Sequence, residues 1–226
     1  MSKQKSNSSK LDNIPWGKLF FELIVVFLGV TAGFLLNDWQ LQSKDSLLEQ
    51  KYKSDFLKDV NTNITILNSA IESDSLWLND AEPKLFEIQK GTISIDSANS
   101  IIKQIIQISR VTLHTSTYEN ITNSGNFNLL EDYNLRKQIV DYHIAISGVG
   151  FIDDYFYQYF NNFVMPFVFK KFRVIKSELD NPTTIKTNQF ENVITGYYSI
   201  VQQRKTAYED LLQKSNELQN MFIKND

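Results

Sequence analysis

The residues able to do acid–base or metal chemistry are few and scattered. The two histidines, His114 and His143, lie far apart, and neither has a second metal ligand one helical turn away except ordinary carboxylates. A zinc site needs at least three protein ligands, which separate helices would have to supply. Cysteine is absent, which excludes thiol catalysis, disulfides and cysteine metal sites. We expect no metal site and no cofactor.

Paired acids are the other candidates for chemistry. Asp153-Asp154 adjoins an aromatic cluster, and Glu131-Asp132 precedes a helical pattern. Such pairs can act as general acid and base, but they are more typical of solvated faces and helix N-termini. No glycine-rich phosphate loop, GxSxG elbow or HExxH occurs. We therefore expect no catalytic residues, and an enzyme using convergent acids or His143 is a third alternative.

Length, net charge and composition limit the class of protein. A length of 226 residues suits one ordinary domain plus an anchor. The net charge of −3 gives no basic surface, so we expect no nucleic acid partner. Only 8 glycines and 4 prolines disfavour an all-β fold rich in tight turns.

The apolar run FFELIVVFLGVTAGFLLNDW predicts a transmembrane helix over residues 16–39. No charged side chain occurs between residues 23 and 36. A helix from Trp16 to Trp39 is about 34 Å long, which matches the separation of the two interfacial aromatic belts of a bilayer. Trp16 marks one interface, and Asn37 and Trp39 mark the other.

Several residues of the span suit contact with other helices. Glu22 has three interpretations: a boundary residue that reaches the headgroups, a partner for an ion pair or hydrogen bond from another subunit, or part of a proton pathway. Gly29 and Gly33 form a GxxxG pattern, to which Ala32 and Thr31 add small side chains. We expect association with other integral membrane subunits or self-association.

A cleaved signal peptide is the rival interpretation, since Val30-Thr31-Ala32 resembles a cleavage site. The apolar run continues through Leu36, so we favour an uncleaved anchor. Lysines outnumber acids before the span, at positions 3, 5, 10 and 18. The positive-inside rule places the polar arm, residues 1–15, in the cytoplasm and residues 40–226 on the other side.

The remaining chain predicts an all-α domain. Apolar residues recur about every 3.7 residues from Leu41 to Leu78, which predicts one helix on the order of 60 Å long that ends near Pro83. Two turns over residues 83–90, closed by Gly91, and a helix over 97–109 should follow. Ser116 and Glu119 form a capping box, whose helix should stop at residues 124–125. The only strand-like stretch is 92–95.

Two longer helices complete the expected domain. One begins at residue 131 and runs into the aromatic stretch 151–172, which Pro166 should kink or break. That stretch is either a buried helix or a surface for lipid or a partner. The other carries a heptad seam and should pack antiparallel against the helix that leaves the membrane. Its seam positions are Phe190, Ile194, Tyr197, Val201, Arg204, Tyr208, Leu211, Ser215, Leu218 and Phe222.

Two sets of motifs resemble a family. The first is Glu22, Gly29 and Asn37-Asp38-Trp39, and the second is TYE at 117–119 with SG at 124–125 and LR at 135–136. Together they are similar to a family of single-pass inner-membrane proteins common in Bacteroidota, a domain of unknown function. Asp38 stands where that family has a second Asn, and Gly33 where a larger residue is usual. The resemblance implies a bacterial inner (cytoplasmic) membrane, a periplasmic domain and no particular activity.

The leading hypothesis is a non-catalytic accessory or scaffold subunit of an inner-membrane complex. The candidate docking segment is Tyr118, Glu119, Gly125, Tyr155, Phe156 and Phe163. For the first three, the alternative is a capped helix with Tyr118 packed inward and Gly125 at a positive φ. The alternative function is a homo-oligomeric periplasmic sensor or receptor for a ligand, which a dry pocket between the helices would favour and a filled core would not.

Overall fold

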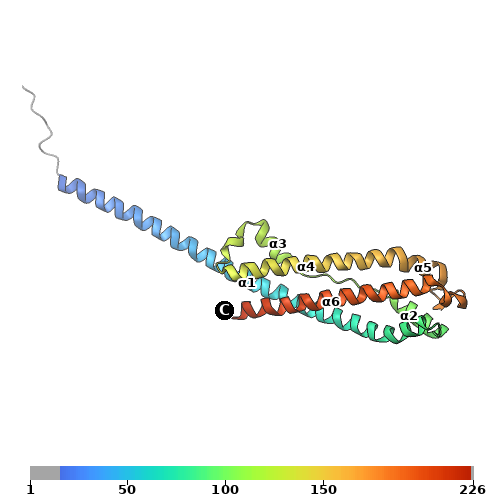
Figure 1. Ribbon diagram of the computed structural model, residues 1–226. Coiled ribbons are helices and arrows are strands. Elements are labelled where there is room, and N and C mark those ends of the chain that lie inside the picture. The colour runs from blue at the N-terminus through green and yellow to red at the C-terminus, as the bar shows by residue number, and fades with distance from the viewer. Residues whose placement is uncertain (1–15, 225–226) are drawn as a thin grey trace, which may run out of the picture. The chain divides into compact units, whose positions relative to one another are not determined.

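The computed structural model describes residues 16–224 and divides into two compact units, residues 1–50 and 51–226. The predicted polar arm, residues 1–15, lies outside the described residues. The all-α class is confirmed apart from one two-stranded sheet. The helices are α1 (Trp16–Gln89), α2 (Ile95–Ile105), α3 (Ser116–Asn123), α4 (Tyr133–Tyr159), α5 (Met165–Lys171) and α6 (Asn188–Lys224) (Figure 1).

The first unit consists of the start of α1. This segment is long and apolar enough to cross a membrane, and it is the one such helix among the described residues. None of its most apolar window is buried, which distinguishes it from the core helix of a soluble protein. A signal sequence passes the same test of length and composition.

The predicted end of this helix near Pro83 is wrong. Pro83 lies inside α1, which continues to Gln89. The proline removes one backbone donor, but the helix buries Leu78 and Ala81 before it and Ile88 after it. Tertiary packing therefore outweighs the local break.

Gly91 closes the helix at its C-terminus, as predicted for residues 83–90, although those residues belong to α1. Its φ of 66° lies in the left-handed region. Its amide donates to the Ile88 carbonyl at 2.9 Å, and the Thr92 amide donates to Glu87 at 2.8 Å. This pair of bonds is the Schellman arrangement, in which glycine is favoured.

The second unit is an antiparallel bundle of α1, α4 and α6. All ten predicted seam positions of α6 are buried, so the heptad prediction is confirmed. Phe222 near the end of α6 stacks on Phe56 of α1 at 6.2 Å between ring centroids, and Tyr197 meets Trp77 at 4.9 Å. The residue numbers run in opposite directions along the two helices, as the sequence predicted. α4 also packs against α6, where the Tyr159 hydroxyl donates to carbonyls of Asn192 and Val193.

The connecting helices differ in detail from the predictions. α2 begins before residue 97 because Ser94 caps it, accepting a 3.0 Å hydrogen bond from the Ser97 amide. Residues 92–95 form no strand. α3 ends where predicted, and Gly125 follows with a φ of 73°. A short 3-10 helix, η1 (Asn126–Leu129), leads to α4.

The α-helix of the aromatic stretch is interrupted just before Pro166, which agrees with the prediction of a break there. A π-helical turn, η2 (Phe160–Val164), joins α4 to α5. Proline cannot donate to the preceding turn, and a π-turn widens the helix where that bond is missing. The stretch is buried only in part: Phe160 and Phe167 lie in the core, whereas Phe151 and Phe169 are exposed.

The sequence did not predict the hairpin of β1 (Phe172–Arg173) and β2 (Glu178–Leu179). The strands are antiparallel, with Phe172 opposite Leu179. A 3-10 helix, η3 (Pro182–Lys186), leads from the hairpin to α6.

Candidate functional site

A buried ion pair crosses the interface between α1 and α6. Arg204 Nε donates to Asp74 Oδ2 at 3.0 Å, and Nη2 donates to Oδ1. Both side chains are buried. The guanidinium also lies over the ring of Phe156, 4.0 Å from its centroid. Side chains of α1 and α4 therefore both contact the guanidinium of Arg204 on α6.

A second buried carboxyl, Asp153, adjoins this pair. It accepts a 2.5 Å hydrogen bond from the Tyr208 hydroxyl. Burial raises the pKa of Asp153, against the effects of the Tyr208 bond and Arg204. Burial lowers the pKa of Arg204, but the bonds to Asp74 outweigh it and hold that pKa above its ordinary value.

A polar cavity of about 290 Å³ opens beside the ion pair. Its lining includes Asp74, Arg204, Trp77 and Tyr197, with Gln104 from α2. Its size lies at the lower end of ligand pockets, so the cavity suits a small polar molecule. Within the part of the chain that the structure describes, buried Trp77 Nε1 and Gln104 Oε1 have no hydrogen-bond partner. The cavity is polar and open, so it is not the dry pocket that would favour a receptor.

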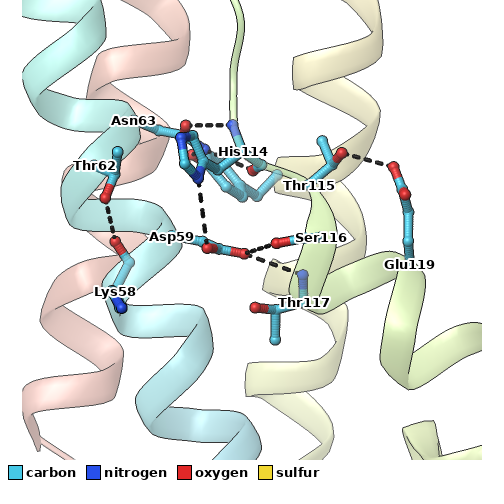
Figure 2. Close-up of polar contacts among 10 residues, drawn as sticks. Lys58, Asp59, Thr62, Asn63, His114, Thr115, Ser116, Thr117 and Glu119 are labelled. Carbon is cyan, nitrogen blue, oxygen red and sulfur yellow. Dashed lines mark hydrogen bonds and ion pairs between the residues drawn. The ribbon is translucent and has the colours of Figure 1, made fainter.

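Polar residues of α1 clamp the connection that leads into α3. Figure 2 shows the Asn63 side chain against the backbone of His114. Asn63 Nδ2 donates to the His114 carbonyl at 2.9 Å, and Oδ1 accepts from the His114 amide at 2.7 Å. Nδ2 also meets the Tyr142 hydroxyl at 3.1 Å. The buried amide of Asn63 therefore holds the His114 backbone against α1.

The predicted capping box at Ser116 is wrong. The N-cap residue of α3 is Thr115, whose hydroxyl donates to Glu119 Oε1 at 2.7 Å. The first turn is capped from another helix: Asp59 Oδ2 accepts from the Thr117 amide at 3.1 Å and from the Ser116 hydroxyl at 3.4 Å (Figure 2). A carboxylate suits a helix N-terminus, so α1 supplies the cap that the local sequence does not.

The six predicted docking residues differ in how far they are exposed to solvent. Tyr118 is half-buried and stacks on His143, with ring centroids 3.8 Å apart. Gly125 has the positive φ expected of a capped helix. Tyr155 and Phe163 are 49% and 57% exposed, whereas Phe156 is 1% exposed and forms part of the core. Burial removes Phe156 from the docking surface.

The span residues all lie on an exposed helix. Trp16, Trp39, Asn37 and Ala32 are exposed. Glu22 Oε1 lies 3.9 Å from Lys18 Nζ. A Cβ added at Gly29 or Gly33 would meet no atom within 4 Å. Helical spacing puts Glu22, Gly29 and Gly33 on one face, which we call the glycine face. Thr31 lies two residues from each glycine and so faces away from them, which corrects its assignment to that face.

Sequence reasoning missed most of the buried cluster. Arg204 stood out as a polar break in the α6 seam, but its partner Asp74 did not. The available signal was position, because Asp74 falls where the apolar spacing of α1 calls for a buried residue. Among residues 16–224, no group of three or more His, Cys, Asp or Glu could hold a metal ion.

Comparison of the chain with protein-family models, curated proteins and solved structures finds no match in any of the three.

Proposed function

We propose that the protein is a non-catalytic accessory subunit of a bacterial inner-membrane complex. In this proposal α1 crosses the membrane once, with the N-terminus in the cytoplasm and the helical domain in the periplasm. The observation that carries the proposal is the glycine face of Glu22, Gly29 and Gly33, exposed on an apolar helix.

The glycine face suits a neighbouring helix for two physical reasons. Gly29 and Gly33 present no side chain, so a second backbone can approach closely. Glu22 lies two helical turns before Gly29, and a carboxylate on an apolar helix is stabilised by a hydrogen-bonding or cationic partner. The resemblance to the inner-membrane family supports the same placement.

The helical domain supports a docking role. Buried side chains of α1, α4 and α6 fill the interior of its bundle. Ile144, Phe151 and Tyr155 are exposed on α4, and Phe163 is exposed on η2. Exposed aromatic side chains are common anchors of protein interfaces.

Affinity purification from native membranes in mild detergent, followed by mass spectrometry, tests the proposal. We expect a stoichiometric integral membrane partner with the unmodified chain and its loss with Gly29→Leu or Glu22→Gln. Phe27→Leu, on the opposite face of the helix, is the matched control and should retain the partner. A chain that purifies alone as a monomer would contradict the proposal.

The second candidate is a homo-oligomeric receptor for a small polar ligand. The cavity beside Arg204 is not the dry pocket expected of a receptor, but its size and polar lining suit such a molecule. A thermal-shift screen of the full chain against amino acids, small amides and sugars tests it. A hit should stabilise the unmodified chain and lose its effect in Gln104→Leu. The control Gln219→Leu, distant from the cavity on α6, should respond like the unmodified chain.

A further inference from the structure

An exposed apolar and basic tip projects from the second unit at residues 169–176 (FKKFRVIK), which we call the basic tip. Ile175 is 100% exposed, Phe169 is 75% exposed, and Val174 is also exposed. Large apolar side chains exposed this fully, on a turn and on the helix just before it, indicate a surface that another molecule or a membrane covers.

The charge of the basic tip is of one sign. It contains Lys170, Lys171, Arg173 and Lys176 and no acidic residue, although the whole chain has a net charge of −3. Arg173 is neutralised by Asp180 at 2.7 Å and by Glu178 at 3.5 Å. Among the described residues, the three lysines form no ion pair. Their charge is available to an anionic surface.

The fold holds the basic tip in place. Phe172 and Leu179 are buried opposite each other in the two-stranded sheet, and the Asp180 amide donates to the Lys171 carbonyl at 2.8 Å. The Leu179 amide also donates to Asn99 Oδ1 of α2 at 2.8 Å. The turn is therefore ordered before any contact forms, which lowers the entropic cost of binding.

Within residues 51–226, the basic tip lies at the end of the bundle opposite residue 51. The Phe56–Phe222 contact marks the near end, and the Phe167–Phe190 contact marks the end that carries the hairpin (Figure 1). The basic tip is thus a separate feature from the glycine face of α1.

We propose that the basic tip docks on the surface of an anionic phospholipid bilayer. Ile175, Val174 and Phe169 enter the headgroup region, while the lysines contact the lipid phosphates. Apolar side chains combined with basic ones are the pattern of interfacial membrane binding. An acidic protein is a poorer match, because the pattern is a projecting turn rather than a surface with a buried, well-packed centre. The inference does not rest on the accessory role.

Vesicle co-sedimentation with the full chain in phosphatidylcholine nanodiscs tests this proposal. Sucrose-loaded acceptor vesicles contain phosphatidylcholine alone or with phosphatidylglycerol. We expect the anionic vesicles to bind at least tenfold more nanodisc, and added salt to weaken that binding.

Two variants separate the contributions of the basic tip. Val174→Ser with Ile175→Ser should reduce binding about tenfold, and Lys170→Gln with Lys171→Gln and Lys176→Gln should abolish the preference for anionic lipid. Ile144→Ser, an exposed position on α4, is the matched control and should leave binding unchanged. Equal binding to both vesicle types, or binding unaffected by the tip variants, would overturn the proposal. So would capture by polyglutamate but not by vesicles, which would identify an acidic protein as the partner.

Discussion

Arg204 and Asp74 form a bidentate ion pair that joins the last helix of the chain to the first, inside the bundle. Neither charge has much access to solvent, so each depends on the other. The pair fixes the register of α6 on α1 at the centre of the domain.

Replacing one residue of the Arg204–Asp74 pair should therefore lower the free energy of unfolding. We expect Arg204→Met to lower the free energy of unfolding by about 3–5 kcal/mol, because Asp74 is left buried and unpaired. The double variant Arg204→Met with Asp74→Leu should recover most of that loss. Urea denaturation measures both. Lys205→Met, which breaks the exposed pair with Glu209, is the neighbouring control and should cost less than about 1 kcal/mol. Equal losses for Arg204→Met and Lys205→Met would contradict this account.

Gly196 is required by the contact between α4 and α6. A Cβ at this position would lie 2.1 Å from the Tyr159 hydroxyl, which donates to carbonyls of α6. Gly196→Ala should destabilise the domain by about 1–3 kcal/mol. Gly148→Ala on α4 is the matched control, since its Cβ would meet nothing within 4 Å, and it should stabilise by up to about 1 kcal/mol. Thermal denaturation compares them, and a stabilising Gly196→Ala would rule out the close approach.

His143 should make the domain sensitive to acid. Burial lowers the pKa of His143 below 6.5, and the Glu119 carboxylate only partly opposes this. The unfolded chain therefore takes up this proton first as the pH falls through 6.5, and stability declines until the folded pKa is reached. His143→Phe keeps a ring for the stack on Tyr118 and should lose less stability between about pH 7.5 and about pH 5. Denaturation midpoints at several pH values provide the comparison. Parallel pH profiles for the two chains would exclude His143 as the source.

Asp59 should stabilise α3 from outside that helix. Asp59→Ala removes the acceptor for the Thr117 amide and the Ser116 hydroxyl, and we expect a loss of about 1–2 kcal/mol. Hydrogen exchange at the Thr117 amide should speed up, while Glu72→Ala, an exposed change on the same helix α1, should leave it unchanged. Unaltered exchange in Asp59→Ala would show that the cap does not hold α3.

The parts of the fold that follow from helical periodicity could be predicted. The α6 seam is regular enough that Arg204 and Ser215 were placed in the interior although they are polar. Positive φ at Gly91 and Gly125 likewise followed from the turns in which they lie. In each case the determining signal was local to the element.

Features that depend on distant partners could not be predicted. An isolated aspartate such as Asp74 resembles a solvated residue until α6 places a guanidinium beside it. Pro83 breaks a helix unless neighbouring helices bury both of its sides, and Asp59 caps α3 only in the folded domain. β1 and β2 have two residues each, too short to show an alternating pattern.

We propose above that the glycine face of α1 binds a neighbouring helix within the membrane. Photocrosslinking in native membranes tests it most directly, with benzoylphenylalanine placed at Val25 beside that face or at Phe27 opposite it. The account predicts one discrete crosslinked product from position 25, little from position 27, and loss of the product when Gly29→Leu is added. Products of equal yield from both positions, or none from position 25, would contradict it.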